Sequence, residues 1–192
     1  MEKEIFTAVA LGIGLSASAG FRVFVPLLIT GLAGRFGFLP LDGSFNWITS
    51  TPILLVFGVA TLAEIVAYYI PIVDNLLDAI ALPFSIAAGT ILTASLLPAE
   101  SEGFRWILGF IVGGGISGTI QGGKTALRLV STGTTGGLAN PIFSTGENSA
   151  AFAIGLLSLL IPVLIGIAVL ILMFAILRRL FSVKRKRKKQ QI

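Results

Sequence analysis

Charged and amide side chains set within apolar sequence are the residues of this chain that could do chemistry. Arg22 follows a run of small residues, and Glu64 lies within an apolar segment. Lys124 and Arg128 come after a glycine-rich stretch, and Asn140 lies in a polar loop. A charge at the centre of a membrane helix costs roughly 2.5–3.5 kcal/mol on insertion scales, so such residues are functional candidates by default.

Three basic side chains are the candidates for holding an anion. An arginine offers a planar fork that binds carboxylate or phosphate through two hydrogen bonds, which suits Arg22 to the task. Lys124 and Arg128 are four residues apart, so a helix places both on one face. Two alternatives stay open: Arg22 extends to the lipid head groups, or the Lys124 pair marks a basic helix end.

Acidic side chains offer the complementary chemistry. We expect Glu64 to pair with these cations or to accept a coupling proton, and a purely structural ion pair is the alternative. Asp74 and Asp78 are four residues apart and follow Pro71. They are expected to line an entrance for a polar substrate or, alternatively, to act as helix caps and solvated ends. Asn140 is expected to add a neutral contact to the ligand.

The composition indicates a protein that crosses a membrane several times. Of 192 residues, 55% are hydrophobic and 12% are charged, whereas a soluble domain carries about 25% charged residues. The mean hydropathy is +0.96. The chain has no cysteine and no histidine, which excludes disulfides, the usual thiolate or imidazole metal sites and a histidine base. With no nucleophile–base pair visible, we expect neither an enzyme nor a cofactor or metal.

Five hydrophobic segments predict an all-α membrane protein. The stretches 5–34 and 104–132 are longer than the roughly 20 residues that a span needs, and small polar residues interrupt both. They are therefore expected to be broken or re-entrant, and paired interrupted segments point to a transporter's binding site. The other segments are 51–70, 79–97 and 150–181, the last with a kink expected at Pro162. Together they form one transmembrane domain over 1–182.

The two interrupted segments are candidates for an internal repeat, with halves 1–98 and 104–182. A shift of 101 positions aligns small residues of the first segment with small residues of the second. The aligned residues are Gly12, Gly14, Ser16, Ala17 and Ser18 with Gly113, Gly115, Ser117, Gly118 and Thr119. An odd number of crossings between the copies makes such a repeat inverted. Chance agreement is the alternative, because small residues are common in membrane helices.

The basic tail, 183–192, suggests an orientation. Six consecutive Lys and Arg residues follow the last apolar segment. This arrangement favours a cytoplasmic anchor on anionic lipid over nucleic-acid binding. Five crossings then place the N-terminus and Asp74 outside and Arg35 inside, and a re-entrant segment reverses part of this assignment. The first four residues are expected to begin the first span and not a removable signal peptide.

Three stretches carry a resemblance to a known family. They are 18–28, with Ser-Ala-Gly-Phe-Arg, then 64–78, and then 124–128 together with 134–141, which ends in Ala-Asn-Pro. The chain resembles a bacterial family of small integral membrane proteins catalogued as domain of unknown function 4126. One departure is Tyr68-Tyr69, where the family pattern tends to carry Ala-Asp and a basic residue. The resemblance implies a multi-pass protein of the bacterial inner membrane and no particular activity.

The function that these patterns favour is a small secondary transporter or flippase-like permease. Its site would lie between the interrupted segments and bind an anionic or polar solute, for example a phosphate-bearing lipid head group. Five spans enclose little interior, so a homodimer or larger assembly is expected. A non-transporting membrane scaffold and a channel are the alternatives.

Overall fold

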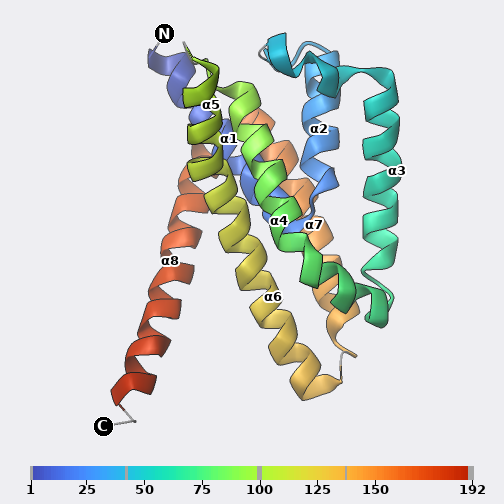
Figure 1. Cartoon of the computed structure of the whole chain (residues 1–192), viewed down its shortest axis with the longest axis vertical. Coiled ribbons are helices and arrows are strands. Elements are labelled where there is room, and N and C mark those ends of the chain that lie inside the picture. The colour runs from blue at the N-terminus through green and yellow to red at the C-terminus, as the bar shows by residue number, and fades with distance from the viewer. Residues whose placement is uncertain (1, 42, 99–100, 137, 190–192) are drawn as a thin grey trace.

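The computed structural model describes residues 2–41, 43–98, 101–136 and 138–189 (Figure 1), and no strand occurs among them. This confirms the all-α prediction. The chain begins with α1 (Glu2–Phe21), α2 (Phe24–Arg35), the short helix η1 (Gly43–Thr49), α3 (Thr51–Ala67) and α4 (Pro71–Leu96). It continues with α5 (Glu102–Leu108), η2 (Gly109–Gly114), α6 (Gly115–Thr135), α7 (Asn140–Leu160) and α8 (Pro162–Lys189).

Two helices of the described chain are long and apolar enough to cross a membrane, Lys3–Phe21 and Glu102–Thr135. A third candidate is the bent pair Gly43–Thr49 and Thr51–Ala67, whose axes differ by 58°. Other apolar helices are shorter, with Ile80–Leu96 as one example. The structure therefore supports a membrane protein, while five crossings stay a prediction.

The first interrupted segment forms a helical hairpin. In Figure 1, α1 runs inward from the N-terminus, the chain reverses at Arg22 and Val23, and α2 returns to the same end of the molecule. The break does not lie within the glycine–serine stretch, which is continuous helix up to Phe21. Small residues there allow close packing of neighbouring helices and do not unwind the backbone.

The second interrupted segment is not broken, so the prediction for it is wrong. The elements α5, η2 and α6 follow one another directly, and η2 is a π-helical stretch inside an otherwise α-helical span. This stretch lies where the span crosses α4. The two helices are so close there that a Cβ on Gly113 would collide with the Gly89 carbonyl. A π-helical turn changes the direction of the following residues without loss of helical hydrogen bonding.

Helix α4 is the common support of both segments. Ser16 of α1 donates a hydrogen bond to the Gly89 carbonyl at 3.0 Å, and its Oγ lies 2.9 Å from that of Thr93. Gly113 of η2 contacts the same turn of α4, at Gly89 and Thr93. Most of the glycines and hydroxyl-bearing residues that suggested a ligand site therefore serve to pack the helices together.

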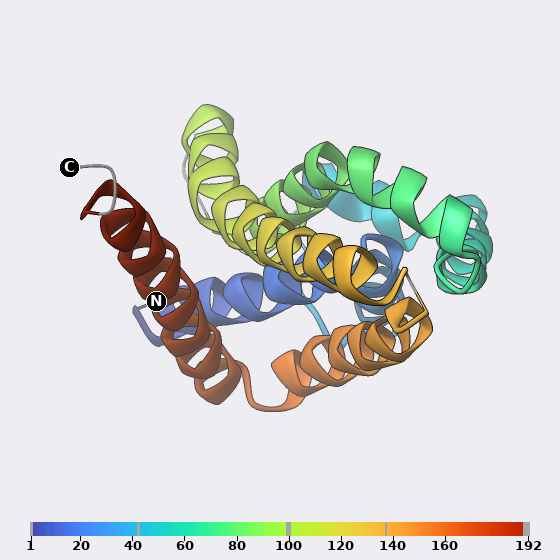
Figure 2. The ribbon, with the colours of Figure 1, turned by 90° about the horizontal axis from the view of Figure 1, so that it is seen from below.

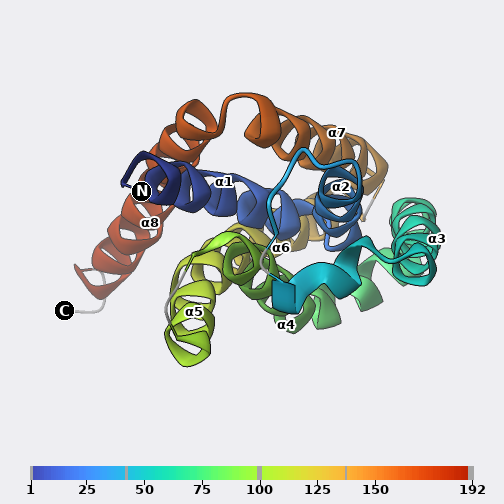
Figure 3. The same cartoon turned by 90° about the horizontal axis from the view of Figure 1, so that it is seen from above.

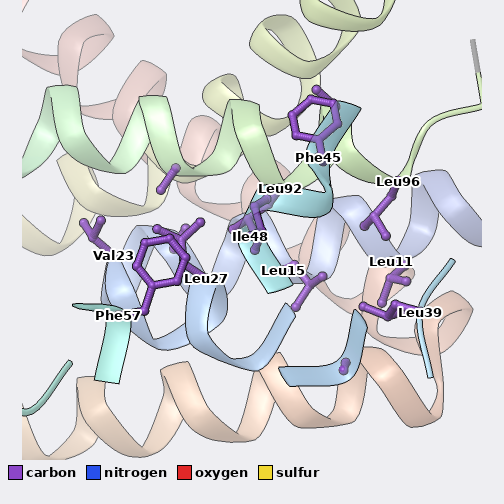
Figure 4. Packing of buried hydrophobic residues seen from close by; sticks show 14 residues of the cluster. Leu11, Leu15, Val23, Leu27, Leu39, Phe45, Ile48, Phe57, Leu92 and Leu96 are labelled. Atoms are coloured by element: carbon purple, nitrogen blue, oxygen red, sulfur yellow. The ribbon is translucent and has the colours of Figure 1, made fainter. Parts of the chain in front are cut away.

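Helix α1 is the centre of the core. Every residue from 10 to 20 is buried, and Figures 2 and 3 show α1 between α7 and α8 on one side and α4 and α6 on the other. Figure 4 shows the main apolar cluster, in which Leu15, Ile48 and Leu92 are fully buried. A helix that is apolar around its whole circumference must be covered by other helices or by lipid, and residues 10–20 of α1 are covered by other helices.

The fifth hydrophobic segment divides into two helices. Helix α7 ends at Leu160, Ile161 has non-helical dihedral angles, and Pro162 begins α8. Figure 1 shows α7 and α8 running in opposite directions along the long axis. In place of the kink expected at Pro162, the chain reverses at Ile161, and Pro162 takes the first position of α8, where a helix needs no backbone N–H.

We predict that Gly113→Ala destabilises the protein although alanine favours helix. The new methyl group would meet the Gly89 carbonyl, and overpacking of this kind costs about 1–3 kcal/mol. Gly115→Ala is the matched control, because a Cβ there has no neighbour within 4 Å. Thermal unfolding in detergent, followed by the fluorescence of Trp47 and Trp106, measures both. Equal melting temperatures for the two variants would contradict the close contact.

Candidate functional site

The break between α1 and α2 leaves backbone groups that need partners inside the molecule. At the start of α2, the N–H groups of Val23 and Phe24 donate to the two carboxylate oxygens of Glu64, at 2.9 and 3.1 Å. At the end of α1, Lys124 donates to the Phe21 carbonyl at 3.1 Å. A carboxylate thus meets the positive end of one helix dipole, and an ammonium meets the negative end of the other.

Glu64 therefore has a more specific position than the sequence suggested. It lies on α3, and its carboxylate accepts hydrogen bonds from the backbone at the break and not from the guanidinium of Arg22. Hydrogen bonds from backbone N–H groups to a carboxylate are charge-assisted and stronger than neutral ones. Glu64 ties α3 to the tip of the hairpin.

Three cations converge on one carboxylate next to this break. Oε2 of Glu147, on α7, lies 3.0 Å from Nη1 of Arg22 and 3.9 Å from Nζ of Lys124. Arg128 approaches the same carboxylate with two nitrogens, and its Nε donates to Oε1 at 2.9 Å. Arg22 also donates to the side-chain oxygen of Asn148. Glu147 is the residue on which the basic groups of α6 and of the hairpin tip meet.

Two further carboxylates come from the first turns of α4. Arg128 forms an ion pair with Asp74 and lies 3.5 Å from Asp78, which in turn is 3.8 Å from Lys124. Asn140 donates to Asp74 at 2.9 Å and accepts a hydrogen bond from Ser131 at 3.1 Å. Asp74 is fully buried and Asp78 is 8% exposed, so both lie inside the cluster and not at a solvated entrance.

The ring of Tyr68 lies among the three cations. Its centroid is 3.8 Å from Cζ of Arg22, 4.7 Å from Cζ of Arg128 and 5.0 Å from Nζ of Lys124. Cations are attracted to the face of an aromatic ring, most strongly where water is excluded. The Tyr68 hydroxyl donates to Asp78 at 3.2 Å. Burial, followed by the charge of Asp78, raises the pKa of Tyr68, so the hydroxyl stays protonated and continues to donate.

We define the charge cluster as three cations and the three carboxylates that pair with them: Arg22, Lys124, Arg128, Asp74, Asp78 and Glu147. The cationic side chains are 0, 5 and 3% exposed, in that order. With every member ionised, the cluster has no net charge. Because unpaired charges cost several kcal/mol each when they leave water, this balance is what makes the burial tolerable.

The structure brings all the residues singled out in the sequence to the hairpin tip. Arg22 is completely buried and does not reach the lipid head groups, and Lys124 and Arg128 do not form an exposed basic end. The sequence did not reveal Glu147, Ser144, Asn148 or the central position of Tyr68. One signal was available, because Asn140, Ser144 and Glu147 follow a helical spacing of four and three and so share one face of α7.

Comparison with known proteins identifies the family. Residues 9–181 match the family described as Domain of unknown function (DUF4126), so the chain belongs to it. No curated protein and no solved structure matches the chain. Among the residues that the structure describes, no group of three or more acidic side chains is arranged to hold a metal ion.

We predict that Glu64→Gln loosens the hairpin. The amide can accept from one backbone N–H but presents a donor to the other, so a charge-assisted bond is lost at a cost of about 1.5–3 kcal/mol. Glu102→Gln removes the same charge at an exposed position and should change stability by less than about 0.5 kcal/mol. Thermal unfolding of both variants is the measurement. Equal stability of Glu64→Gln and the unmodified protein would show that the carboxylate does not hold the break.

We also predict that charge balance, more than any single pair, stabilises the charge cluster. Asp74→Asn and Arg128→Met each leave one charge uncompensated and should each cost about 3–5 kcal/mol. The double variant removes one charge of each sign. Its loss of stability should therefore be no more than half of the larger loss found in the two single variants. The amount of folded protein and its melting temperature in the three variants test this coupling. Simple addition of the two losses would contradict it.

Proposed function

We propose that this member of the family is a small secondary transporter or flippase-like permease for a solute that carries an anionic group. The observation that carries the proposal is a helical hairpin whose tip ends on a buried cluster of opposite charges. The partners in that cluster come from α4, α6 and α7. Transporters commonly build their sites from half-helix ends and ionisable side chains near the midplane of the bilayer.

A topology with a re-entrant hairpin accompanies this proposal. The hairpin α1–α2 enters and leaves from one side, and α3, α4, α5–α6, α7 and α8 cross. If the basic tail faces cytoplasm and anionic lipid, the N-terminus and Arg35 lie outside, and the α3–α4 and α6–α7 turns lie inside. Arg35 then lies outside, whereas five crossings that begin with the first segment would place it inside.

The shared position on α4 supports a relation between the two interrupted segments. The shift of 101 residues pairs Ser16 with Ser117, and both lie at the turn of α4 that contains Gly89. We propose that the segments descend from a repeat in which the first copy folds back and the second runs through. Because α1 and α5–α6 both start at the end of the molecule that holds the N-terminus, the two copies are parallel in this topology and not inverted as the sequence predicted. Rocking of the hairpin against α4 and α6 would then open the charge cluster alternately to the two sides.

A non-transporting scaffold is the competing function. It would use the charge cluster only as a tie between helices. Apolar side chains of similar volume usually serve that purpose as well as a buried ion network, or better. Six ionised groups in the interior of a short membrane chain are an energetically costly way to hold helices together. We therefore favour a site in which an ion-pair partner is exchanged for a ligand.

We predict that a cysteine placed beside the charge cluster, here called a cluster cysteine, reacts with a water-soluble thiol reagent added to either side of the membrane. The chain has no native cysteine, so Ser144→Cys gives a single labelled position, and Ser131→Cys gives a second if the first variant folds poorly. Both side chains are buried in this structure, and labelling therefore reports opening. The experiment uses proteoliposomes of fixed orientation and a membrane-impermeant maleimide.

Three controls define the outcome. Phe38→Cys follows α2, and Leu138→Cys lies between α6 and α7; the positions are 77% and 87% exposed. The end of α2 and the α6–α7 turn lie at opposite ends of the molecule in Figure 1, so each cysteine should react from one side only. Leu62→Cys, on the outer face of α3, should resist the reagent from both sides because lipid covers it. Labelling of the cluster cysteines from one side only, or from neither, would favour the scaffold.

A further inference from the structure

We infer that the carboxylate of Glu147 occupies the position of the ligand's oxyanion, and that a singly charged ligand enters together with one proton, which Glu147 takes up. This inference rests on the proposed function, because it assigns a ligand class and a coupling rule to the same site. The chemistry recognised is that of an oxyanion, whether it belongs to a free solute or to a lipid head group.

The geometry at Glu147 is that of an anion-binding site already filled. Arg22 and Lys124 lie 3.0 and 3.9 Å from the same carboxylate oxygen, and Arg128 binds both oxygens of the group. Arginine forks and a lysine ammonium around one oxyanion are what a protein uses to bind carboxylate or phosphate. Here the chain supplies the anion itself.

Glu147 is a more exchangeable partner than the two carboxylates of α4. Asp74 also accepts from the amide of Asn140, and Asp78 also accepts from the hydroxyl of Tyr68. The contacts that hold Glu147 are with the three cations. Loss of its charge would therefore release Arg22, Lys124 and Arg128 together, and these are the groups that an entering oxyanion needs.

Charge balance fixes the coupling. The cluster is neutral with three cations and three carboxylates, while the nearby carboxylate of Glu64 is held by the backbone N–H groups of Val23 and Phe24 at the start of α2. A further buried negative charge would therefore be uncompensated. If a proton binds to the Glu147 carboxylate as the oxyanion arrives, the total charge is unchanged. No covalent bond forms or breaks other than the O–H bond of the new carboxylic acid.

The proton is taken up in a field set by several elements. Glu147 faces Arg22 at the end of α1 and Lys124 and Arg128 on α6. Asp78 and Asp74 on α4 lie behind these cations, and Tyr68 and Glu64 approach from α3. An arriving oxyanion would compete with the Glu147 carboxylate for the three cations and place a second negative charge beside it, so we expect oxyanion binding and proton uptake to occur together.

Thermal unfolding with a defined oxyanion tests the inference without any transport assay. Methanesulfonate is the probe, because its single charge is the same at about pH 5.5 and about pH 8. Sodium chloride at equal concentration controls for ionic strength. In the unmodified protein, methanesulfonate should raise the melting temperature by at least about 3 °C at the lower pH and by less than about 1 °C at the higher pH.

The variant Glu147→Gln removes the internal anion and with it the need for a proton. Methanesulfonate should stabilise this variant equally at both pH values, while Glu102→Gln should behave like the unmodified protein. A stabilisation of the unmodified protein that is equal at both pH values would overturn the inference, as would the absence of any stabilisation with both methanesulfonate and an anionic lipid. So would a pH dependence that persists in Glu147→Gln. If that variant does not fold, the two pH values of the unmodified protein decide alone.

A second arm separates the sources of the oxyanion. Dihexanoyl phosphatidylglycerol replaces methanesulfonate, and dihexanoyl phosphatidylcholine, with the same acyl chains and no net charge, is its control. Proton-dependent stabilisation by the anionic lipid alone assigns a head group, and stabilisation by methanesulfonate assigns a free solute. If neither methanesulfonate nor the anionic lipid stabilises the protein, the inference is overturned. Proton-linked binding in a protein whose cluster cysteines label from one side only would retain the inference and reject transport.

Discussion

A helix break in the apolar interior requires that every exposed backbone group find a partner, and the rest of this structure follows from that requirement. Neither lipid nor a packed core can hydrogen-bond the free ends of α1 and α2. Glu64 satisfies the N–H groups of Val23 and Phe24, and Lys124 satisfies the Phe21 carbonyl. Two helices far apart in sequence must therefore place opposite charges at the hairpin tip.

Those charges create a second requirement, which is neutrality. Lys124 lies beside Arg22 and Arg128, and three buried cations repel one another unless carboxylates separate them. Asp78 and Glu147 do so, and the ring of Tyr68 adds an attractive surface without adding charge. A cluster built in this way responds as a unit, because the interior screens charges poorly and a change at one member alters the energy of all the others.

The sequence revealed the ingredients of this site and not its connections. A charge within an apolar segment is conspicuous, so Arg22, Glu64 and Lys124 could be singled out from their surroundings alone. Which carboxylate meets which cation depends on helix packing, and α7 carries Glu147 in a locally polar stretch that resembles a loop. The same limit explains the two glycine-rich segments. Glycine permits both unwinding and close approach, and only the contact with Gly89 on α4 shows that close approach prevails.

The break itself follows the packing of α1. Up to Phe21, small residues let α1 lie directly against α4 and α6, where Gly20 leaves no room for a side chain beside Ile120. Directly after that point the chain carries Arg22, whose side chain is fully buried. The guanidinium turns toward Glu147 and the Tyr68 ring, and the backbone reverses into α2. The last close-packed glycine and the first buried cation thus lie together at the hairpin tip, beside the carboxylate of Glu147 that we propose a ligand displaces.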